Sequence, residues 1–131
     1  MNFKNIVLCC IAILFSVYIM AQDSVLGNIS SALQTGNAAQ LAGEFDSNVE
    51  VTIVDSDDVY SKSQAEMILK KFFNSNAPKS FQFIHQGNSA EGSHYGIGNY
   101  TAVSGKKYRT YVYVKQKGEK YFIQEIRFEN D

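Results

Sequence analysis

The sequence predicts an α+β domain in which N-terminal helices pack on one face of a mostly antiparallel sheet. Two observations support this class. Before Pro78, the single proline, most apolar residues recur at three- and four-residue spacing, as on a helix face. After Pro78 the chain reads as strand-like runs separated by Gly-containing turns. The predicted order is helix, helix, hairpin, helix and a four-strand meander.

Residues 1–21 have the pattern of a cleavable export signal. Lys4 is followed by an apolar run from Ile6 to Met20, and Ala21 precedes a polar segment. This run is shorter than the roughly 20 apolar residues that span a bilayer, so we expect no stable membrane anchor. We predict cleavage after Ala21, which leaves residues 22–131 as a single secreted or periplasmic domain.

The composition excludes several kinds of chemistry. Cys9 and Cys10 both lie within the predicted signal, so the mature chain has no thiol for disulfides, thiolate catalysis or cysteine-ligated metals. Of 12 basic side chains Lys4 is lost with the signal, so 11 basic residues face 13 acidic ones. That balance gives no general attraction for nucleic acid. We expect no cofactor and no metal.

Two short helices open the predicted domain. Residues 23–35 place one apolar stripe along a helix, and Gly36 is a suitable C-terminal stop. Asn37 is a suitable N-cap for a second helix over residues 38–44. The residues expected to face the core are Val25, Leu26, Ile29, Ala32, Leu33, Leu41 and Phe45.

A hairpin and a third helix follow. Apolar residues alternate over 48–54, which predicts a half-buried strand, and residues 55–58 are rich in the Asp and Ser that favour turns. The return strand is expected to begin at Val59. Ser61 and Gln64 form a capping-box pattern at the start of a helix. Its apolar face comprises Ala65, Ile68, Leu69, Phe72 and Phe73.

Four strands complete the expected domain. They are predicted over residues 80–86, 94–101, 107–116 and 120–129. The expected turns are Gly87-Asn88, Ser104-Gly105 and Lys117-Gly118. Gly96-Ile97-Gly98 lacks the context of a dinucleotide-binding loop and is interpreted as a bend in the sheet.

The helix–Gly–helix–Phe pattern from Ala32 to Phe45, followed by the strand over 48–54, resembles the opening of the nuclear transport factor 2-like superfamily. This superfamily includes SnoaL-like and ketosteroid-isomerase-like proteins. The phrases Phe83-Ile84-His85-Gln86-Gly87 and Ile126-Arg127-Phe128-Glu129 are also similar to a family of small exported bacterial proteins of unknown function. The resemblance implies a cone in which a curved sheet wraps around the helices.

The resemblance also implies where isomerase chemistry would reside. Aligned on Leu33, Gly36 and Phe45, the tyrosine position falls at Ile29, the general base at Ile53 and the protonated acid at Val112 or Val114. Alkyl groups neither accept protons nor donate hydrogen bonds to an oxyanion, so that chemistry is predicted to be absent.

Two polar clusters have simpler interpretations than metal binding. Asp55, Asp57 and Asp58 lack the Gly and Glu spacing of a calcium loop, which favours a solvated turn. His85 and His94 could meet across strands and act with Glu91 on a metal or a proton. Only two of the three converging ligands that a metal needs are visible there, so we predict no metal site.

The segment from Tyr108 to Val114 is apolar or aromatic on both faces of a strand. When helices cover one face of a sheet, the other face is normally polar. The aromatic second face of this strand therefore carries either exposed tyrosines or the contact surface of a homodimer. The candidate dimer face is Tyr111, Tyr113, Tyr121 and Ile123. The candidate binding residues are His85, Tyr95, Arg109 and Tyr111. Arg109 with Lys107 and Lys115 could form an anion site or protect an edge strand.

We therefore expect a non-catalytic exported domain that forms a homodimer and binds a small molecule or a protein partner. The alternative is an isomerase- or hydratase-type enzyme with a displaced acid–base set drawn from Asp55, Tyr60, His85 and Tyr95. That alternative requires two of these groups to converge inside one cavity.

Overall fold

The computed structural model describes residues 25–89 and 91–131 and confirms the predicted order of elements. The predicted signal over residues 1–21 lies outside the described residues. An N-terminal helix covers residues 25–35. It is followed by α2 (Ala38–Ala42), β1 (Phe45–Ile53), β2 (Ser56–Ser61), α3 (Lys62–Ser75), β3 (Pro78–Ser89), β4 (Ser93–Ala102), β5 (Lys107–Lys117) and β6 (Lys120–Asn130).

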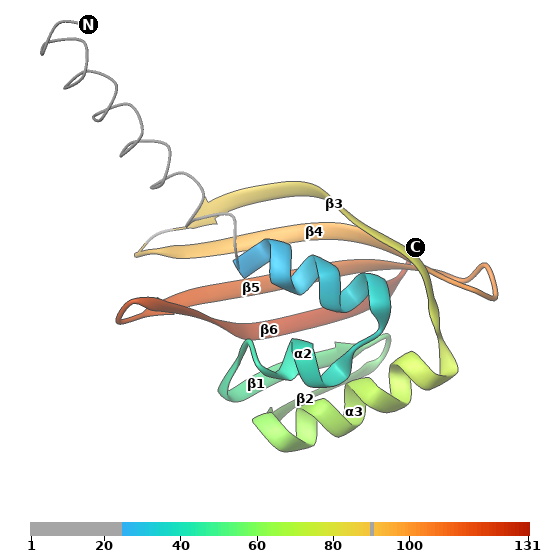
Figure 1. The fold of residues 1–131 in the computed structure, drawn as a ribbon, viewed down its shortest axis with the longest axis horizontal. Coiled ribbons are helices and arrows are strands. Elements are labelled where there is room, and N and C mark those ends of the chain that lie inside the picture. Colours follow the sequence, from blue (N-terminus) through green and yellow to red (C-terminus); the bar gives the residue numbers. More distant parts are fainter. Residues whose placement is uncertain (1–24, 90) are drawn as a thin grey trace, which may run out of the picture.

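The strands form one mixed sheet in the order β2-β1-β6-β5-β4-β3. β1 and β6 are parallel, and every other neighbouring pair is antiparallel. The curved sheet wraps around the helices on one of its faces (Figure 1). The expected α+β class and mostly antiparallel sheet are confirmed.

Local side-chain chemistry sets the helix ends as predicted. Gly36 takes a φ of 65°, a left-handed conformation that suits glycine at a helix C-terminus. The Asn37 side chain accepts a hydrogen bond from the Gln40 amide at 3.0 Å and caps α2. Ser61 and Gln64 form the reciprocal capping box of α3.

Three predicted boundaries were wrong. The hairpin turn is Val54-Asp55 rather than residues 55–58, so Ser56 already belongs to β2. β1 begins at Phe45, because the second helix ends at Ala42. The expected turn at Gly87-Asn88 lies inside β3, which pairs with β4 as far as Ser89.

The inside of the cone is filled by aromatic side chains. Phe72 of α3 packs on Phe128 of β6 with ring centroids 4.3 Å apart, and it also contacts Tyr100 and Tyr108. Both tyrosine hydroxyls end on Asn76: Tyr108 donates to its side-chain oxygen at 2.8 Å and Tyr100 to its backbone carbonyl. Asn76, the residue that follows α3, thereby satisfies both buried hydroxyl groups.

The two glycines of β4 make room for more of these rings. A Cβ on Gly96 would lie 2.6 Å from the ring of Phe83, and one on Gly98 would lie 2.6 Å from the ring of Phe81. The predicted bend is therefore a close approach between β4 and the aromatic side chains of β3. Within the described ranges, no helix is long and apolar enough to cross a membrane.

Candidate functional site

The interior positions that the superfamily resemblance marks for catalysis are core residues here. Ile29, Val112 and Val114 are fully buried, and Ile53 packs against the same cluster. These alkyl side chains occupy the space between the helices and the sheet. They can neither transfer a proton nor stabilise an oxyanion, so this part of the cone has a packing role.

The second face of the sheet, turned away from the helices, carries the features of a contact surface. We call this the outer sheet face. Side chains on it alternate with the core residues of each strand. Its principal members are His85, Tyr95, Ile97, Arg109, Tyr111, Tyr113, Phe122, Glu125 and Arg127.

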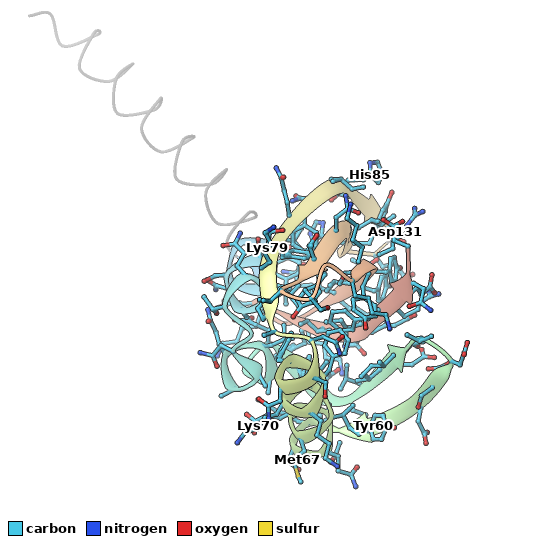
Figure 2. All side chains as sticks on the ribbon, turned by 90° about the vertical axis from the view of Figure 1, so that its right-hand side faces the viewer. Tyr60, Met67, Lys70, Lys79, His85 and Asp131 are labelled. Atoms are coloured by element: carbon cyan, nitrogen blue, oxygen red, sulfur yellow. The ribbon has the colours of Figure 1, made fainter. Side chains whose placement is uncertain are left out.

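All four candidate binding residues lie on this face. His85, Ile97 and Tyr111 are direct neighbours across β3, β4 and β5, while Tyr95 and Arg109 lie in the adjacent rows. Figure 2 shows His85 at the end of the molecule far from Met67 of α3. The outer sheet face therefore brings together four candidate binding residues that are up to 26 positions apart in the sequence.

The rings of this face are held in place. The His85 Nε2 atom and the Tyr95 hydroxyl lie 3.1 Å apart, and the Tyr95 ring crosses over Gly87, where a Cβ would lie 2.5 Å from its hydroxyl. Tyr95 stacks towards Tyr111 with a centroid distance of 6.4 Å. Arg127 lies over the Tyr111 ring, 4.8 Å from its centroid, and forms a cation–π contact with it.

Carboxylates gather beside the tyrosines. Arg127 forms ion pairs with Glu125 and, at 3.7 Å, with Glu129. Glu50 of β1 is the direct neighbour of Glu125, and burial followed by the charge of Glu125 raises the pKa of Glu50. Burial also raises the pKa of Tyr111. This side of the face is consequently acidic, whereas Lys107, Arg109 and Lys115 make β5 basic.

Part of the predicted dimer face was wrong. Tyr111 and Tyr113 lie on the outer sheet face, but Ile123 is fully buried on the helix-covered face and Tyr121 packs against the core. The reason is a bulge in β6: Tyr113 pairs with Glu125, yet Val114 pairs with Ile123. The extra residue inverts the alternation, so Phe122 opposite Lys115 takes the outward position instead.

The strand positions also correct the interpretation of the basic residues. β5 lies between β4 and β6, so Lys107, Arg109 and Lys115 do not protect a sheet edge. Sequence reasoning missed Ile97, Glu125 and Arg127. The alternation of Glu125, Arg127 and Glu129 with Ile126 and Phe128 was a readable signal for the last two.

The two histidines lie on opposite faces of the sheet. His94 pairs with Asn88 across β3 and β4, with Nδ1 and the Asn88 Oδ1 2.5 Å apart, and its ring contacts Tyr121 on the helix side. Within residues 25–89 and 91–131, no cluster of three or more His, Cys, Asp or Glu could hold a metal ion.

The displaced acid–base set of the enzyme alternative does not converge in a cavity. His85 and Tyr95 do meet, but on the exposed outer sheet face. Asp55 lies in the exposed hairpin turn, and Tyr60 packs at the rim of the core.

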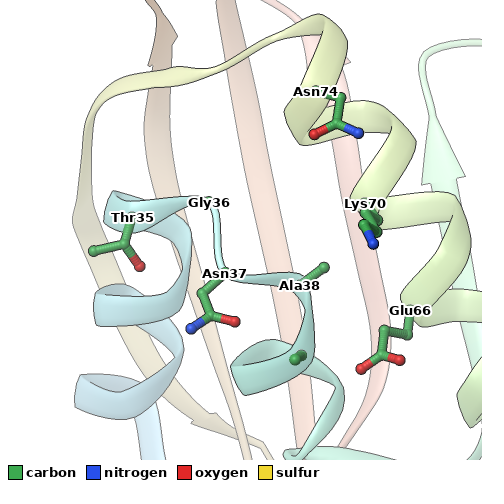
Figure 3. A pocket seen from close by; sticks show the side chains of 8 residues that line it. Thr35, Gly36, Asn37, Ala38, Glu66, Lys70 and Asn74 are labelled. Atoms are coloured by element: carbon green, nitrogen blue, oxygen red, sulfur yellow. The ribbon is translucent and has the colours of Figure 1, made fainter.

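A groove of about 520 Å³ separates α2 from α3. Glu66, Lys70 and Asn74 follow one side of α3 and face Thr35 and the α2 cap (Figure 3). Gly36, Ala38 and Ala39 complete the lining. These polar groups lie at helical spacing on an open surface, which is what a solvated helix face requires.

Comparisons with known proteins establish the family. Residues 26–129 match the family model described as "Domain of unknown function (DUF4783)". The chain belongs to the DUF4783 family. The predicted relationship to a family of unknown function is thereby confirmed.

Solved structures agree with this assignment. A DUF4783 protein from Bacteroides fragilis is 26% identical, with a TM-score of 0.74 over 79% of this chain and 96% of the other. One from Bacteroides uniformis is 24% identical, with a TM-score of 0.75 over 80% and 95%. An "ntf2-like protein of unknown function" from Shewanella baltica is 9% identical, with a TM-score of 0.67 over 89% and 96%, which confirms the cone fold. The search of curated proteins finds no match.

Proposed function

We propose that this DUF4783 domain is a non-catalytic, exported binding protein that works as a homodimer through its outer sheet face. The observation that carries this proposal is the half-buried aromatic surface of β4 and β5, which comprises Tyr95, Ile97, Tyr111 and Tyr113. Tyrosine and arginine are typical anchors of protein interfaces. The filled cone leaves this face as the better-formed surface for recognition.

Charge supports a second copy of the chain as the occupant. Basic β5 and acidic β6 are adjacent strands, with Arg109 directly beside Glu129. A twofold axis that runs between them, parallel to the strands, sets β5 of one copy opposite β6 of its partner. Such an isologous arrangement pairs opposite charges twice around the central tyrosines.

The rings are also prepared for contact. Tyr95 is fixed by His85, and Tyr111 lies between Tyr95 and Arg127. Side chains that are already ordered lose little conformational entropy on association. Export is part of the proposal and follows from the pattern of residues 1–21.

Sedimentation velocity on the chain beginning at Gln22 tests the proposal. We expect a dimer that Tyr113→Asp converts to a monomer, because the new charge would be buried opposite the partner's Glu125. Met67→Asp on α3 is the matched control, since Met67 is 63% exposed and lies on the helix side. A second variant, Arg109→Glu, should weaken the dimer without touching an aromatic ring. A strict monomer at high concentration, or equal dissociation by the Met67 control, would overturn the homodimer.

A further inference from the structure

A second groove, remote from the tyrosines of the outer sheet face, contains a half-buried carboxylate. It measures about 510 Å³ and lies where the N-terminal helix, the α2–β1 connection, the start of α3 and the β5–β6 hairpin meet. The residues that matter for its chemistry are Val25, Asn28, Glu44, Lys62, Lys120 and Tyr121. We call it the Glu44 groove.

The backbone of Glu44 is held firmly in this place. Its N–H donates to the Leu41 carbonyl at 3.0 Å, and its carbonyl accepts from the Ile123 amide at 2.7 Å. These bonds tie the residue between the end of α2 and the middle of the sheet. The side chain therefore projects from a fixed point rather than from a free loop.

The carboxylate is short of partners. Burial raises the pKa of Glu44, while a hydrogen bond from Asn28 and the charge of Lys62 act in the opposite direction. Across residues 25–89 and 91–131, the ion pairs are those of Asp46, Glu125 and Glu129, and none reaches Glu44. An ionised carboxylate can accept about four hydrogen bonds, so capacity remains for a cationic donor.

The rest of the groove supplies features that are complementary to a zwitterionic ligand. Lys62 and Lys120 present ammonium groups that suit a carboxylate or carbonyl oxygen. Tyr121 and Val25 provide an apolar wall. An acceptor, donors and an apolar wall in one concave site are the elements that a small-ligand site needs.

We propose that the Glu44 groove binds the α-ammonium group of an apolar amino acid, free or at the start of a peptide, with Glu44 as its direct partner. A bound ammonium replaces the hydration that Glu44 loses in the fold. The lysines then contact the ligand's carboxylate or first carbonyl, and its side chain lies against Val25 and the ring of Tyr121.

Titrations of the ¹⁵N-labelled chain beginning at Gln22 test this site. L-leucine should shift the amide signals of residues around Glu44, and N-acetyl-L-leucine, which lacks the ammonium, should not. L-leucinamide, which has the ammonium but no carboxylate, distinguishes a free amino acid from the amino terminus of a peptide. Equal affinity for the amide indicates a peptide's amino terminus, whereas weaker affinity indicates a free amino acid held by its carboxylate.

Glu44→Gln should weaken leucine binding about tenfold or more, because it removes the charge but keeps the shape. Glu119→Gln, at the rim of the same groove, should leave it within about twofold, as expected for an exposed charge. Glu44→Gln should melt at or above the wild-type temperature, since the ionised carboxylate is the desolvated form. Equal binding of N-acetyl-L-leucine, no shift with any ligand, or unchanged affinity in Glu44→Gln would overturn the site. The ligand comparison on the wild-type chain holds even if that variant fails to fold.

Discussion

Replacement of Gly98 by alanine tests the filled cone quantitatively. A Cβ on Gly98 would lie 2.6 Å from the ring of Phe81 and 2.7 Å from the backbone carbonyl oxygen of Gln82. The carbonyl contact is about 0.7 Å too short for ordinary van der Waals packing. The ring can rotate, but the carbonyl belongs to β3 and moves only with the strand.

Overpacking of this kind costs about 2–3 kcal/mol when backbone must shift. For a domain of this size the melting temperature should fall by about 8–12 °C. The assay is thermal unfolding followed by circular dichroism, with urea unfolding as a second measure. Gly27→Ala is the matched control, because Gly27 lies in the N-terminal helix with nothing within 4 Å of its would-be Cβ. It should stabilise the protein by about 0.5–1 kcal/mol through helix propensity.

The opposite signs of the two glycine substitutions are the informative result. A Gly98→Ala protein within about 0.5 kcal/mol of wild type would refute the tight contact between β3 and β4. It would mean that the cone has space beside Phe81, and hence room for a ligand.

Two further substitutions probe single polar groups. Thr110 is fully buried, and its hydroxyl has no hydrogen-bond partner among the described residues. Thr110→Val should therefore raise the free energy of unfolding by about 1 kcal/mol. A lower free energy of unfolding in this variant would show that the hydroxyl is hydrogen-bonded. Hydrogen bonds from Lys117 and Gln124 lower the pKa of Asp46 from 3.8 to about 2. A lowered folded-state pKa stabilises the fold above the unfolded-state value and loses that effect as the pH falls towards 2. Asp46→Asn should therefore be less stable than wild type by roughly 1 kcal/mol at pH 7 and equally stable near pH 2. The figure is small because solvent screens the exposed Lys117. A deficit that persists unchanged at low pH would contradict the ion pair.

Features with local causes were predictable from the sequence. Gly36, the Asn37 cap and the Ser61–Gln64 capping box each depend on residues a few positions apart, and all three occur as expected. The four strands after Pro78 were also located, because alternation and turn residues are local signals.

Features set by distant contacts were not predictable in the same way. Gly87 looked like a turn residue, but it is a glycine because the Tyr95 ring lies across it from the next strand. Val54 turns the β1–β2 hairpin with a φ of 57°, a conformation uncommon for a β-branched residue.

The candidate site shows the same division. Alternation within one strand places Arg109 and Tyr111 on the same face, but only the pairing of β3, β4 and β5 shows that His85 and Tyr95 share it. The bulge in β6 has no sequence marker, so Tyr121 and Ile123 were assigned to the wrong side. Glu44 carried no motif, and only the meeting of four elements gives it a half-buried position.

The most direct test of the outer sheet face is nuclear magnetic resonance with a soluble paramagnetic probe at increasing protein concentration. Side chains in the dimer interface should lose contact with the probe as the dimer forms. The ring signals of Tyr95, Tyr111 and Tyr113 should become protected, while the methyl group of Met67 stays fully attenuated. Tyrosine rings that remain equally attenuated at every concentration, or protection at Met67 instead, would contradict the proposed interface.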